Sequence, residues 1–253
     1  MARPLRFPSV RFFPRRVLLM PDPIQLNGMA SAASALQMLE RRQQVLANNL
    51  ANATTRGFKG ETPFARLMQN SLAATDTALD VTEGPMTETH STLDLAIKGN
   101  GYFVTQTPSG ERLTRDGSFA LDADQRLVDS HGNPVLGEAG PITFPNGTVE
   151  IDTNGMVKVN GRPVQRLRLE RVADGAKLQH EGGTQFVPDA SRKAIPPEDR
   201  RIMQGFVEGS NVNTMFAMTQ MIDVLREFSA AQKTMTTIDS VRGIATTEIG
   251  KPI

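Results

Sequence analysis

The sequence contains no cysteine, no tryptophan and only one tyrosine in 253 residues. The lack of cysteine excludes disulfide bonds and thiolate metal sites, although it does not fix the compartment, because a protein can work outside the cytoplasm without disulfides. Aromatic residues make up only 5% of the chain, which argues against a large compact enzyme core. A net charge of +1 provides no strong electrostatic field for nucleic acid or for an acidic membrane surface.

Long apolar runs are also lacking, since no stretch approaches the ~20 apolar residues of a membrane-spanning helix. The first 19 residues carry five arginines and no acid, which leaves a net charge of −4 on the rest of the chain. A cleaved signal peptide would need about 7–15 apolar residues after this basic region, and the apolar run there is too short. We therefore expect no cleaved signal. We interpret residues 1–26 as a basic arm or, the alternative we favour, as a misassigned start with Met20 as the true first residue.

Small and apolar residues recur at alternating spacings of three and four in the N-terminal segment, residues 27–59. This spacing predicts an amphipathic helix with a heptad seam from residue 27 to about residue 53. At 1.5 Å per residue the helix would be roughly 40 Å long. The seam contains Met29, Ala32, Leu36, Leu39, Leu46, Leu50 and Ala53, with Gln43 as its one polar member.

The same spacing returns without interruption in the C-terminal segment, residues 206–253. Asn211 or Asn213 is a candidate N-cap for a helix that we expect to end near Thr247. Because most helical stability comes from packing, each seam must meet a partner. The spacing permits both an intramolecular hairpin and a multi-subunit coiled coil. This second seam contains Ala217, Met221, Val224, Phe228, Ala231, Met235 and Ile238.

The middle of the chain, residues 60–205, is punctuated by glycine and proline and shows no long helical period. Short apolar runs separated by Asn-Gly turns are typical of antiparallel strands, because Asn-Gly favours the positive φ angles of tight hairpins. We therefore predict an α+β fold, with long N- and C-terminal helices and a mostly antiparallel β domain inserted between them. The expected strands cover residues 101–107, 118–122, 148–152, 156–160 and 164–172.

No stretch of the sequence predicts a catalytic, cofactor or metal site. The three histidines, His90, His131 and His180, have no partner at ligand spacing, and we expect isolated surface residues. Residues 99–104 (GNGYFV) lack the last glycine of a dinucleotide fingerprint. Residues 122–127 (DADQRL) begin like a calcium loop but lack its later ligand and glycine. Since no nucleophile, base and oxyanion site can be assembled, we expect a protein that is not an enzyme and has no cofactor.

Four stretches resemble the flagellar basal-body rod and hook proteins. They are LANNLANATTRGFK (46–59), DLAIKGNGYFV (94–104), TRDGSFALDADQRLVDSHGNPVLG (114–137) and QGFVEGSNVN (204–213). The resemblance spans about residues 27–250. The short interval between the first two stretches is similar to that of the proximal-rod type. The distal-rod type is the alternative within the family, and a secreted non-enzymatic binding module is an alternative outside it.

The resemblance implies where the protein works and what it contacts. The resemblance implies that the N- and C-terminal helices pair as an α-helical core packed toward the rod axis, while the β domain stands outward. The implied partners are other rod subunits, copies of this chain and the flagellar type III export apparatus, with no nucleic acid and no transmembrane segment. The implied location is the basal-body rod in the periplasmic space, reached without a cleaved signal peptide.

Three asparagines crowd the end of the first predicted helix, although asparagine is a mediocre helix former. An amide can satisfy an interfacial polar group without a charge. We therefore interpret these asparagines as residues that fix helix register between rod subunits, with C-capping and turn formation as the alternative. Gly57 would permit the turn toward the β domain. The predicted assembly interface comprises Leu36, Leu39, Leu46, Asn48, Asn49, Leu50, Asn52, Gly57, Phe58, Met221, Val224, Phe228, Met235 and Ile238.

Overall fold

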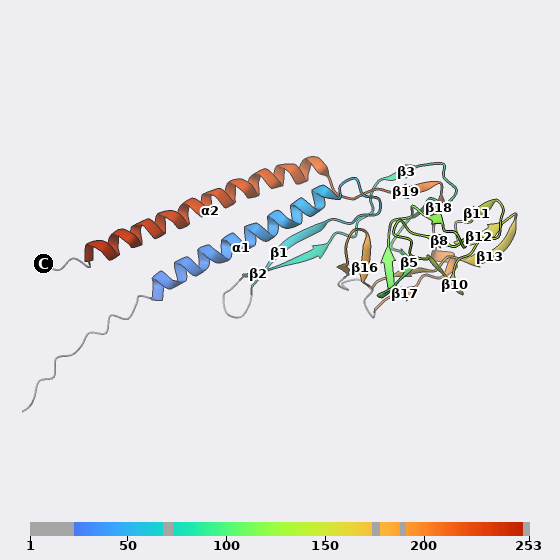
Figure 1. The fold of residues 1–253 in the computed structure, drawn as a ribbon, viewed down its shortest axis with the longest axis horizontal. Helices are drawn as coiled ribbons and strands as arrows, with labels where there is room; N and C mark the ends of the chain where they lie inside the picture. Colours follow the sequence, from blue (N-terminus) through green and yellow to red (C-terminus); the bar gives the residue numbers. More distant parts are fainter. Residues whose placement is uncertain (1–22, 68–72, 174–177, 188–190, 250–253) are drawn as a thin grey trace, which may run out of the picture.

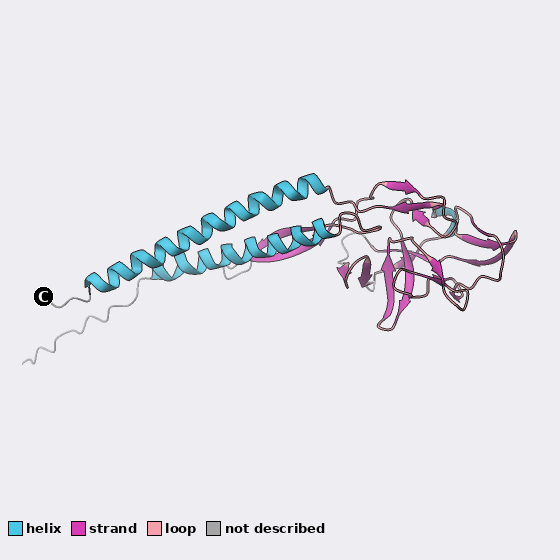
Figure 2. Cartoon of the chain, turned by 45° about the horizontal axis from the view of Figure 1, so that its top comes forward, coloured by secondary structure: helices cyan, strands magenta, loops and turns pink. Residues whose placement is uncertain are grey.

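The computed structural model describes residues 23–67, 73–173, 178–187 and 191–249. Two long helices lie side by side at one end of the molecule, and most strands gather in a β region at the other end (Figures 1 and 2). Helix α1 (Pro23–Ala51) has 29 residues and helix α2 (Thr214–Ile249) has 36. The fold is α+β, as the sequence predicts.

The two helices contact each other within one chain. Val224 of α2 is 0% exposed and forms an apolar cluster with Leu39 and Leu46 of α1. At the edge of this cluster, Arg42 lies 3.5 Å from the carboxylate of Glu227. The middle of each predicted seam therefore meets the other seam inside the molecule. Three further residues of α2 pack against the cluster: Met221, Phe228 and Ala231.

A second face of α1 is covered by a β-hairpin that the sequence did not reveal. Strands β1 (Glu61–Leu67) and β2 (Ala73–Leu79) pair in antiparallel register and lie alongside α1 (Figure 1). Val45 and Asn49 of α1 are buried although they lie off the predicted seam. Because an isolated two-stranded ribbon is marginally stable in water, the hairpin depends on this helix for packing.

The remaining strands form several small antiparallel sheets. The largest has the order β15-β16-β6-β5-β14-β17, and another has the order β11-β12-β13. Four two-stranded sheets pair β3 with β19, β4 with β18, β7 with β8, and β9 with β10. The bounds are β3 (Met86–Glu88), β4 (Leu95–Ile97), β5 (Tyr102–Thr107), β6 (Gly110–Thr114), β7 (Ala120–Leu121), β8 (Leu127–Val128), β9 (Leu136–Gly137), β10 (Gly140–Pro141), β11 (Val149–Ile151), β12 (Met156–Val159), β13 (Arg162–Arg166), β14 (Leu169–Arg171), β15 (Gln179–His180), β16 (Gln185–Val187), β17 (Lys193–Ala194), the 3₁₀ turn Pro197–Asp199, β18 (Ile202–Gln204) and β19 (Phe206–Glu208).

Apolar side chains from several of these sheets share one core. Phe103 and Phe119 meet edge to face, with ring centroids 5.0 Å apart. A smaller cluster includes Tyr102 and Phe186, and Leu79 of the β1–β2 hairpin packs against it. Since β3 and β4 pair with β19 and β18, the C-terminal strands close this core beside strands from the first half of the chain. The fully buried members of the larger core include Leu95, Leu127, Val135, Ile142, Val157, Leu167 and Leu169.

Two expected boundaries differ from the observed ones, whereas the start of α2 agrees with one of the two candidate N-caps. The single strand expected over 164–172 is wrong, because β13 and β14 belong to different sheets and the chain crosses between them at the buried Leu167. Helix α1 begins at Pro23, inside the expected arm of residues 1–26, of which residues 1–22 lie outside the described part. Helix α2 begins at Thr214, after strand β19 and a short extended link.

The N-cap of α2 is Asn213, one of the two candidates that the sequence offered. Its side-chain Oδ1 accepts a hydrogen bond of 3.0 Å from the backbone N–H of Phe216. This contact satisfies one of the free N–H groups at the helix start. Among the described residues, no helix is long and apolar enough to span a membrane.

Replacing Val224 with aspartate should separate α1 from α2 in the isolated subunit. The carboxylate would be buried among Leu39 and Leu46, where an unpaired charge costs several kcal/mol. We expect hydrogen-exchange protection of the α2 amides to fall while the β region keeps its protection. Arg226→Asp, at an exposed position of the same helix, is the matched control and should leave protection nearly unchanged. Equal protection in both variants would show that this cluster does not hold the helices together.

Candidate functional site: the joint between the helices and the β region

Three distant stretches of the chain meet where both helices join the β region. We refer to residues 57–60, 114–117 and 208–211 together as the joint. Lys59 Nζ lies 2.6 Å from Oε1 of Glu208, and a guanidinium nitrogen of Arg115 lies 3.1 Å from Oε2 of the same carboxylate. The three side chains are no more than 1% exposed. One buried carboxylate therefore holds two buried cations.

Backbone groups satisfy most of the remaining polar atoms of this cluster. Lys59 also donates to the carbonyl of Thr82, and Arg115 donates to the carbonyl of Ile97 at 2.9 Å and to that of Gly99. Oε1 of Glu208 accepts a further hydrogen bond of 2.9 Å from a loop amide, that of residue 84. Such bonds are required because a buried charge without partners is strongly destabilising. They tie the end of α1 to strands β4 and β19.

The surroundings of the cluster change the pKa of Lys59 and that of Tyr102. Burial lowers the pKa of Lys59 below its usual 10.5; Glu208 opposes this shift, and Arg115 adds to it. Burial also raises the pKa of Tyr102. The guanidinium of Arg115 lies over the Tyr102 ring, 5.2 Å from its centroid, which adds a cation–π contact. With all three side chains ionised, Lys59, Arg115 and Glu208 carry a formal charge of +1.

Gly57 makes the turn that brings Lys59 into the joint. Its φ of +67° is a conformation that glycine adopts readily. A Cβ at this position would overlap the backbone of Arg115 and Asp116. The amide of Gly57 also donates a hydrogen bond of 2.7 Å to the carbonyl of Glu208. The turn predicted at Gly57 is therefore confirmed, and it has a second purpose, which is close contact with the third stretch of the joint.

An aromatic stack supports the joint on its other side. Phe58 is buried and stacks on His180 with centroids 5.4 Å apart, and His180 contacts Phe186 at 4.6 Å. Nε2 of His180 lies 3.1 Å from the carbonyl oxygen of Lys59. The expectation of an isolated surface histidine is therefore wrong for His180, whose side chain is only 12% exposed. The neighbours that bury it are distant in the sequence, so local patterning could not reveal them.

The three asparagines at the end of α1 have different surroundings. Asn49 is buried and forms a pair of hydrogen bonds with the backbone of Glu61, donating to its carbonyl at 2.7 Å and accepting from its amide at 2.9 Å. Asn52 follows the last residue of α1 and donates to the carbonyl of Asn48 at 3.0 Å, which fits the capping alternative. Asn48 is exposed. The amide of Asn49 thus fixes the first strand of the hairpin to the helix within the chain.

The apolar residues of the predicted interface fall into two groups. Leu39, Leu46 and Val224 are buried between α1 and α2, with Met221 and Phe228 packed against them. The other four helix residues are half-buried in the single chain: Leu36, Leu50, Met235 and Ile238. Phe58, outside the helices, is buried in the joint against His180. The structure thus brings the first group together inside one molecule.

Several residues of the joint were not among the predicted site residues. Asn211 accepts a hydrogen bond of 2.8 Å from the amide of Gly60 and donates to the carbonyl of Asp80 at 2.8 Å. Lys59, Arg115 and Glu208 were also missed as a group, although each lies in one of the stretches that carry the family resemblance. Their place in these stretches was the available signal.

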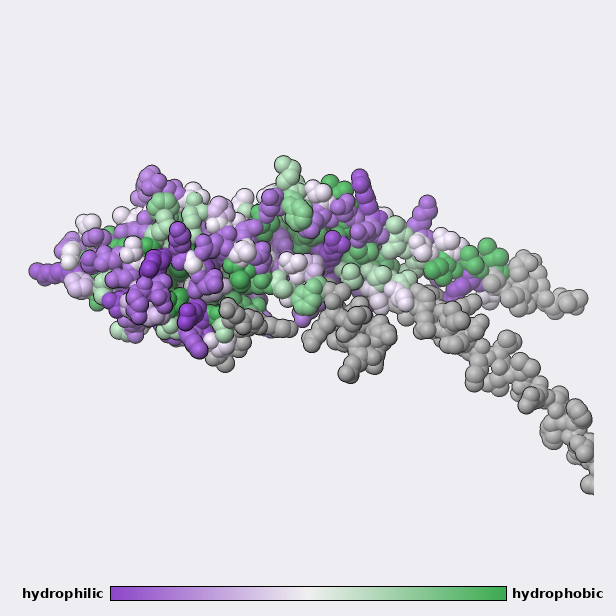
Figure 3. Space-filling view, turned by 180° about the vertical axis from the view of Figure 1, so that it is seen from behind, coloured by the Kyte–Doolittle hydropathy of each residue, from purple (hydrophilic) through white to green (hydrophobic). Residues whose placement is uncertain are grey.

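An apolar stripe of α2 remains exposed beside the packed seam. Met215 is 79% exposed and Ile222 is 51% exposed. Hydrophobic residues also lie on the last turns of α2, whereas the β region is mostly hydrophilic in the view of Figure 3. We refer to Met215, Met218, Ile222 and Leu225 as the exposed stripe; they recur at spacings of three and four and have large exposed side chains.

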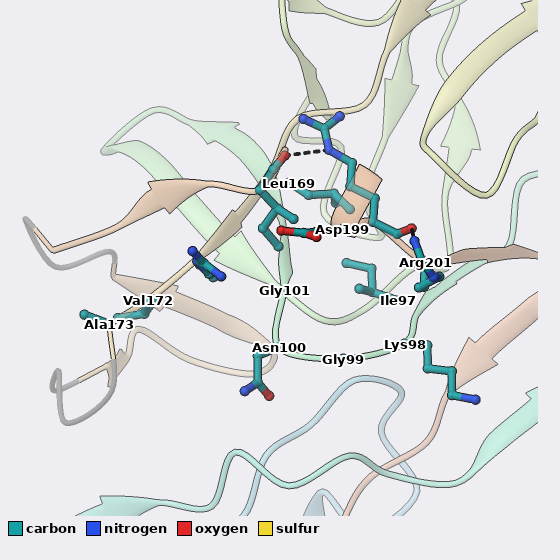
Figure 4. Close-up of a pocket in the computed structure, with 13 residues that line it drawn as sticks. Ile97, Lys98, Gly99, Asn100, Gly101, Leu169, Val172, Ala173, Asp199 and Arg201 are labelled. Atoms are coloured by element: carbon teal, nitrogen blue, oxygen red, sulfur yellow. Dashed lines mark hydrogen bonds between the residues drawn. The ribbon is translucent and has the colours of Figure 1, made fainter. Parts of the chain in front are cut away.

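The β region carries a pocket of about 580 Å³ that lacks a catalytic arrangement (Figure 4). Arg200 in its wall donates to the carbonyls of Leu167 and Ile195, both at 2.7 Å, and to Glu138 at 2.9 Å, so this guanidinium holds strands together. Across the ranges that the structure describes, no group of three histidine, cysteine, aspartate or glutamate side chains is placed to hold a metal ion.

Comparison with known proteins gives three matches to families, in chain order. The flagella basal body rod protein family matches residues 29–59, the flagellar hook protein FlgE/F/G D1 domain matches residues 96–159, and the flagellar basal body rod FlgEFG protein C-terminal family matches residues 203–247. The flagellar basal-body rod protein FlgF of Caulobacter vibrioides is 33% identical over 241 residues, which cover 89% of this chain and 98% of the relative. This chain belongs to the flagellar basal-body rod protein family.

Other members of the rod protein family show which type is most similar. FlgF of Escherichia coli is 32% identical over 244 residues, covering 87% of this chain and 96% of the relative. FlgG of Buchnera aphidicola is 27% identical over 248 residues, covering 82% and 94%. The chain is thus a FlgF-like rod protein. Each of the three matched segments contributes one side chain to the ionic cluster of the joint: Lys59, Arg115 and Glu208 in turn.

Replacing Asn49 with alanine should destabilise the hairpin against α1, because the amide and the carbonyl of Glu61 would both lose a partner. We expect a loss of about 1–3 kcal/mol in the free energy of unfolding, measured by urea denaturation. Asn48→Ala is the matched control, and a change within about 0.5 kcal/mol is expected there because Asn48 is exposed. Equal losses at the two positions would contradict a specific role for Asn49.

The lowered pKa of Lys59 predicts an alkaline dependence of stability. Between that lowered pKa and 10.5, the unfolded chain holds a proton that the folded chain has lost, so the free energy of unfolding should rise with pH. Lys59→Met lacks this group and supplies the reference. The difference in unfolding free energy, wild type minus variant, should therefore increase across this window in pH-dependent denaturation. A constant difference would contradict the inferred direction of the shift.

Proposed function

We propose that this chain is a structural subunit of the flagellar basal-body rod, of the proximal-rod (FlgF) type. The observation that carries the proposal is the exposed stripe on α2, because it lies beside a seam that is already packed within the chain. An apolar stripe on a long helix gains about 25 cal/mol per Å² when a neighbour covers it. In the rod, the covering surface is a helix of another rod subunit or of a second copy of this chain.

The assembly contact proposed here lies beside the two seams. Val224 and its neighbours join α1 to α2, so that the chain presents a preformed pair of helices to its neighbours. The exposed stripe and the half-buried ends of the seams then pack against neighbouring helices in a coiled-coil-like manner. Asn48, which is exposed, remains a candidate for fixing register between subunits. Packing of this kind, repeated around the rod, would transmit torque along it.

The same proposal covers export and location. The chain reaches the rod, in the periplasmic space, through the flagellar type III export apparatus and without a cleaved signal peptide. It acts through contacts with other rod subunits and has no enzymatic activity, so a zymogram against peptidoglycan should be blank. The alternative within the family is the distal-rod type, which the similarity to FlgG supports less strongly. Tracing this chain in a density map of an intact basal body distinguishes the two types.

Replacing Ile222 with aspartate should block rod assembly without unfolding the subunit. Ile222 is exposed in the single chain, so the charge stays hydrated there and becomes buried only against a neighbour. We expect a normal circular dichroism spectrum, loss of swimming in a complemented deletion strain, and basal bodies that lack a complete rod. Asp223→Lys, also exposed and about 100° around the helix from Ile222, changes the charge on a face away from the stripe; it is the matched control and should swim. Normal swimming of the Ile222 variant would exclude the exposed stripe as an assembly surface.

A further inference from the structure

The ionic cluster of the joint contains one carboxylate and two cations. Within the described ranges, Lys59 and Arg115 each form their one ion pair with Glu208. The carboxylate is separated from these cations by 149 and 93 residues along the chain. The acid therefore belongs to the C-terminal segment, whereas both cations belong to earlier parts of the sequence.

Removing one cation and removing the acid have opposite electrostatic consequences. Without Lys59 or without Arg115, a neutral ion pair remains. Without Glu208, two cations face each other in a buried site, where like charges repel and each cation loses its counter-charge. The contribution of Arg115 to the lowered pKa of Lys59 is a sign of this repulsion in the intact joint.

The segment that carries Glu208 also fixes the backbone of the link between α1 and β1. The carbonyl of Glu208 accepts from the amide of Gly57, and the side chain of Asn211 accepts from the amide of Gly60. Strand β19, which ends at Glu208, pairs with β3 in the first half of the chain. A single docking event thus brings in the carboxylate, the acceptors for the end of α1, and the start of α2.

We propose that Glu208 is the positioning residue of the joint: by neutralising Lys59 and Arg115 together, it makes the direction of the helical pair conditional on docking of the C-terminal segment. Before residues 204–213 dock, repulsion between the two cations keeps the end of α1 away from the β region. After docking, the joint closes and the helices take their fixed direction. This inference stands on contacts within one chain and does not depend on the proposed function.

Three full-length variants test the charge balance: Glu208→Gln, Lys59→Met and the two combined. Glutamine keeps the shape of the side chain and can still accept from the amide of Gly84, but it carries no charge. The first measurement is hydrogen exchange at the amides of Gly57 and Gly60. The second is the distance between spin labels on cysteines introduced at two exposed positions, residues 47 and 130, since the chain has no cysteine of its own.

We expect Glu208→Gln to lower amide protection in the joint by about tenfold or more and to broaden the distribution of distances between the two spin labels. Lys59→Met should have a smaller effect. The double variant should recover much of the protection that Glu208→Gln loses, because one of the two facing cations is gone. If Glu208 acted only by packing, the losses of amide protection in the two single variants would instead add up in the double variant. The control, Glu88→Gln on the paired strand β3, should change neither measurement, because Glu88 is exposed.

Two results would overturn the proposal. One is a double variant that is no better protected than Glu208→Gln. The other is a Lys59→Met variant that loses as much amide protection as Glu208→Gln. If Glu208→Gln fails to fold, the double variant decides the question alone: a folded double variant supports charge neutralisation, and an unfolded one contradicts it.

Discussion

The carboxylate of Glu208 is the contact on which the arrangement of this molecule depends. It holds Lys59 from the link between α1 and β1 and Arg115 from the start of the loop after β6, and its own segment leads into α2. Two long helices connected to a β region by single backbone segments could otherwise change their direction relative to that region. A buried carboxylate with two cations restricts them because any movement that separates the charges leaves one of them buried without a partner.

The faces of the two helices differ in what covers them. One face of α1 packs on α2 through Leu39 and Leu46, and another face contacts the β1–β2 hairpin, where Asn49 forms hydrogen bonds with the backbone of Glu61. Helix α2 packs through one seam inside the chain, and its exposed stripe is uncovered in the single chain. A rod subunit with this design would keep its shape before assembly, and would gain further apolar burial only when neighbours cover the stripe.

Much of the fold could be predicted from local pattern. The alternation of three and four predicted both helices, and every residue of the second seam from Ala217 to Ile238 is more buried than the residues between its members, apart from the half-buried Gln220. Asn-Gly turns and short apolar runs predicted the β region. The hairpin over α1 was missed, because Val45 and Asn49 lie outside the seam and nothing local marks a second buried face. The strand expected over 164–172 was wrong because its apolar spacing continues across a change of sheet.

By itself, the sequence determined the α+β class, the two seams, the turn at Gly57 and membership of the rod family, because each of these depends on spacing or on short local motifs. Only the tertiary structure decided which surface meets each seam, what Asn49 binds, and that His180 is buried. It alone also brought Lys59, Arg115 and Glu208 together. The physical reason is that burial and charge pairing depend on neighbours in space, and the joint takes its neighbours from residues 149 and 93 positions apart.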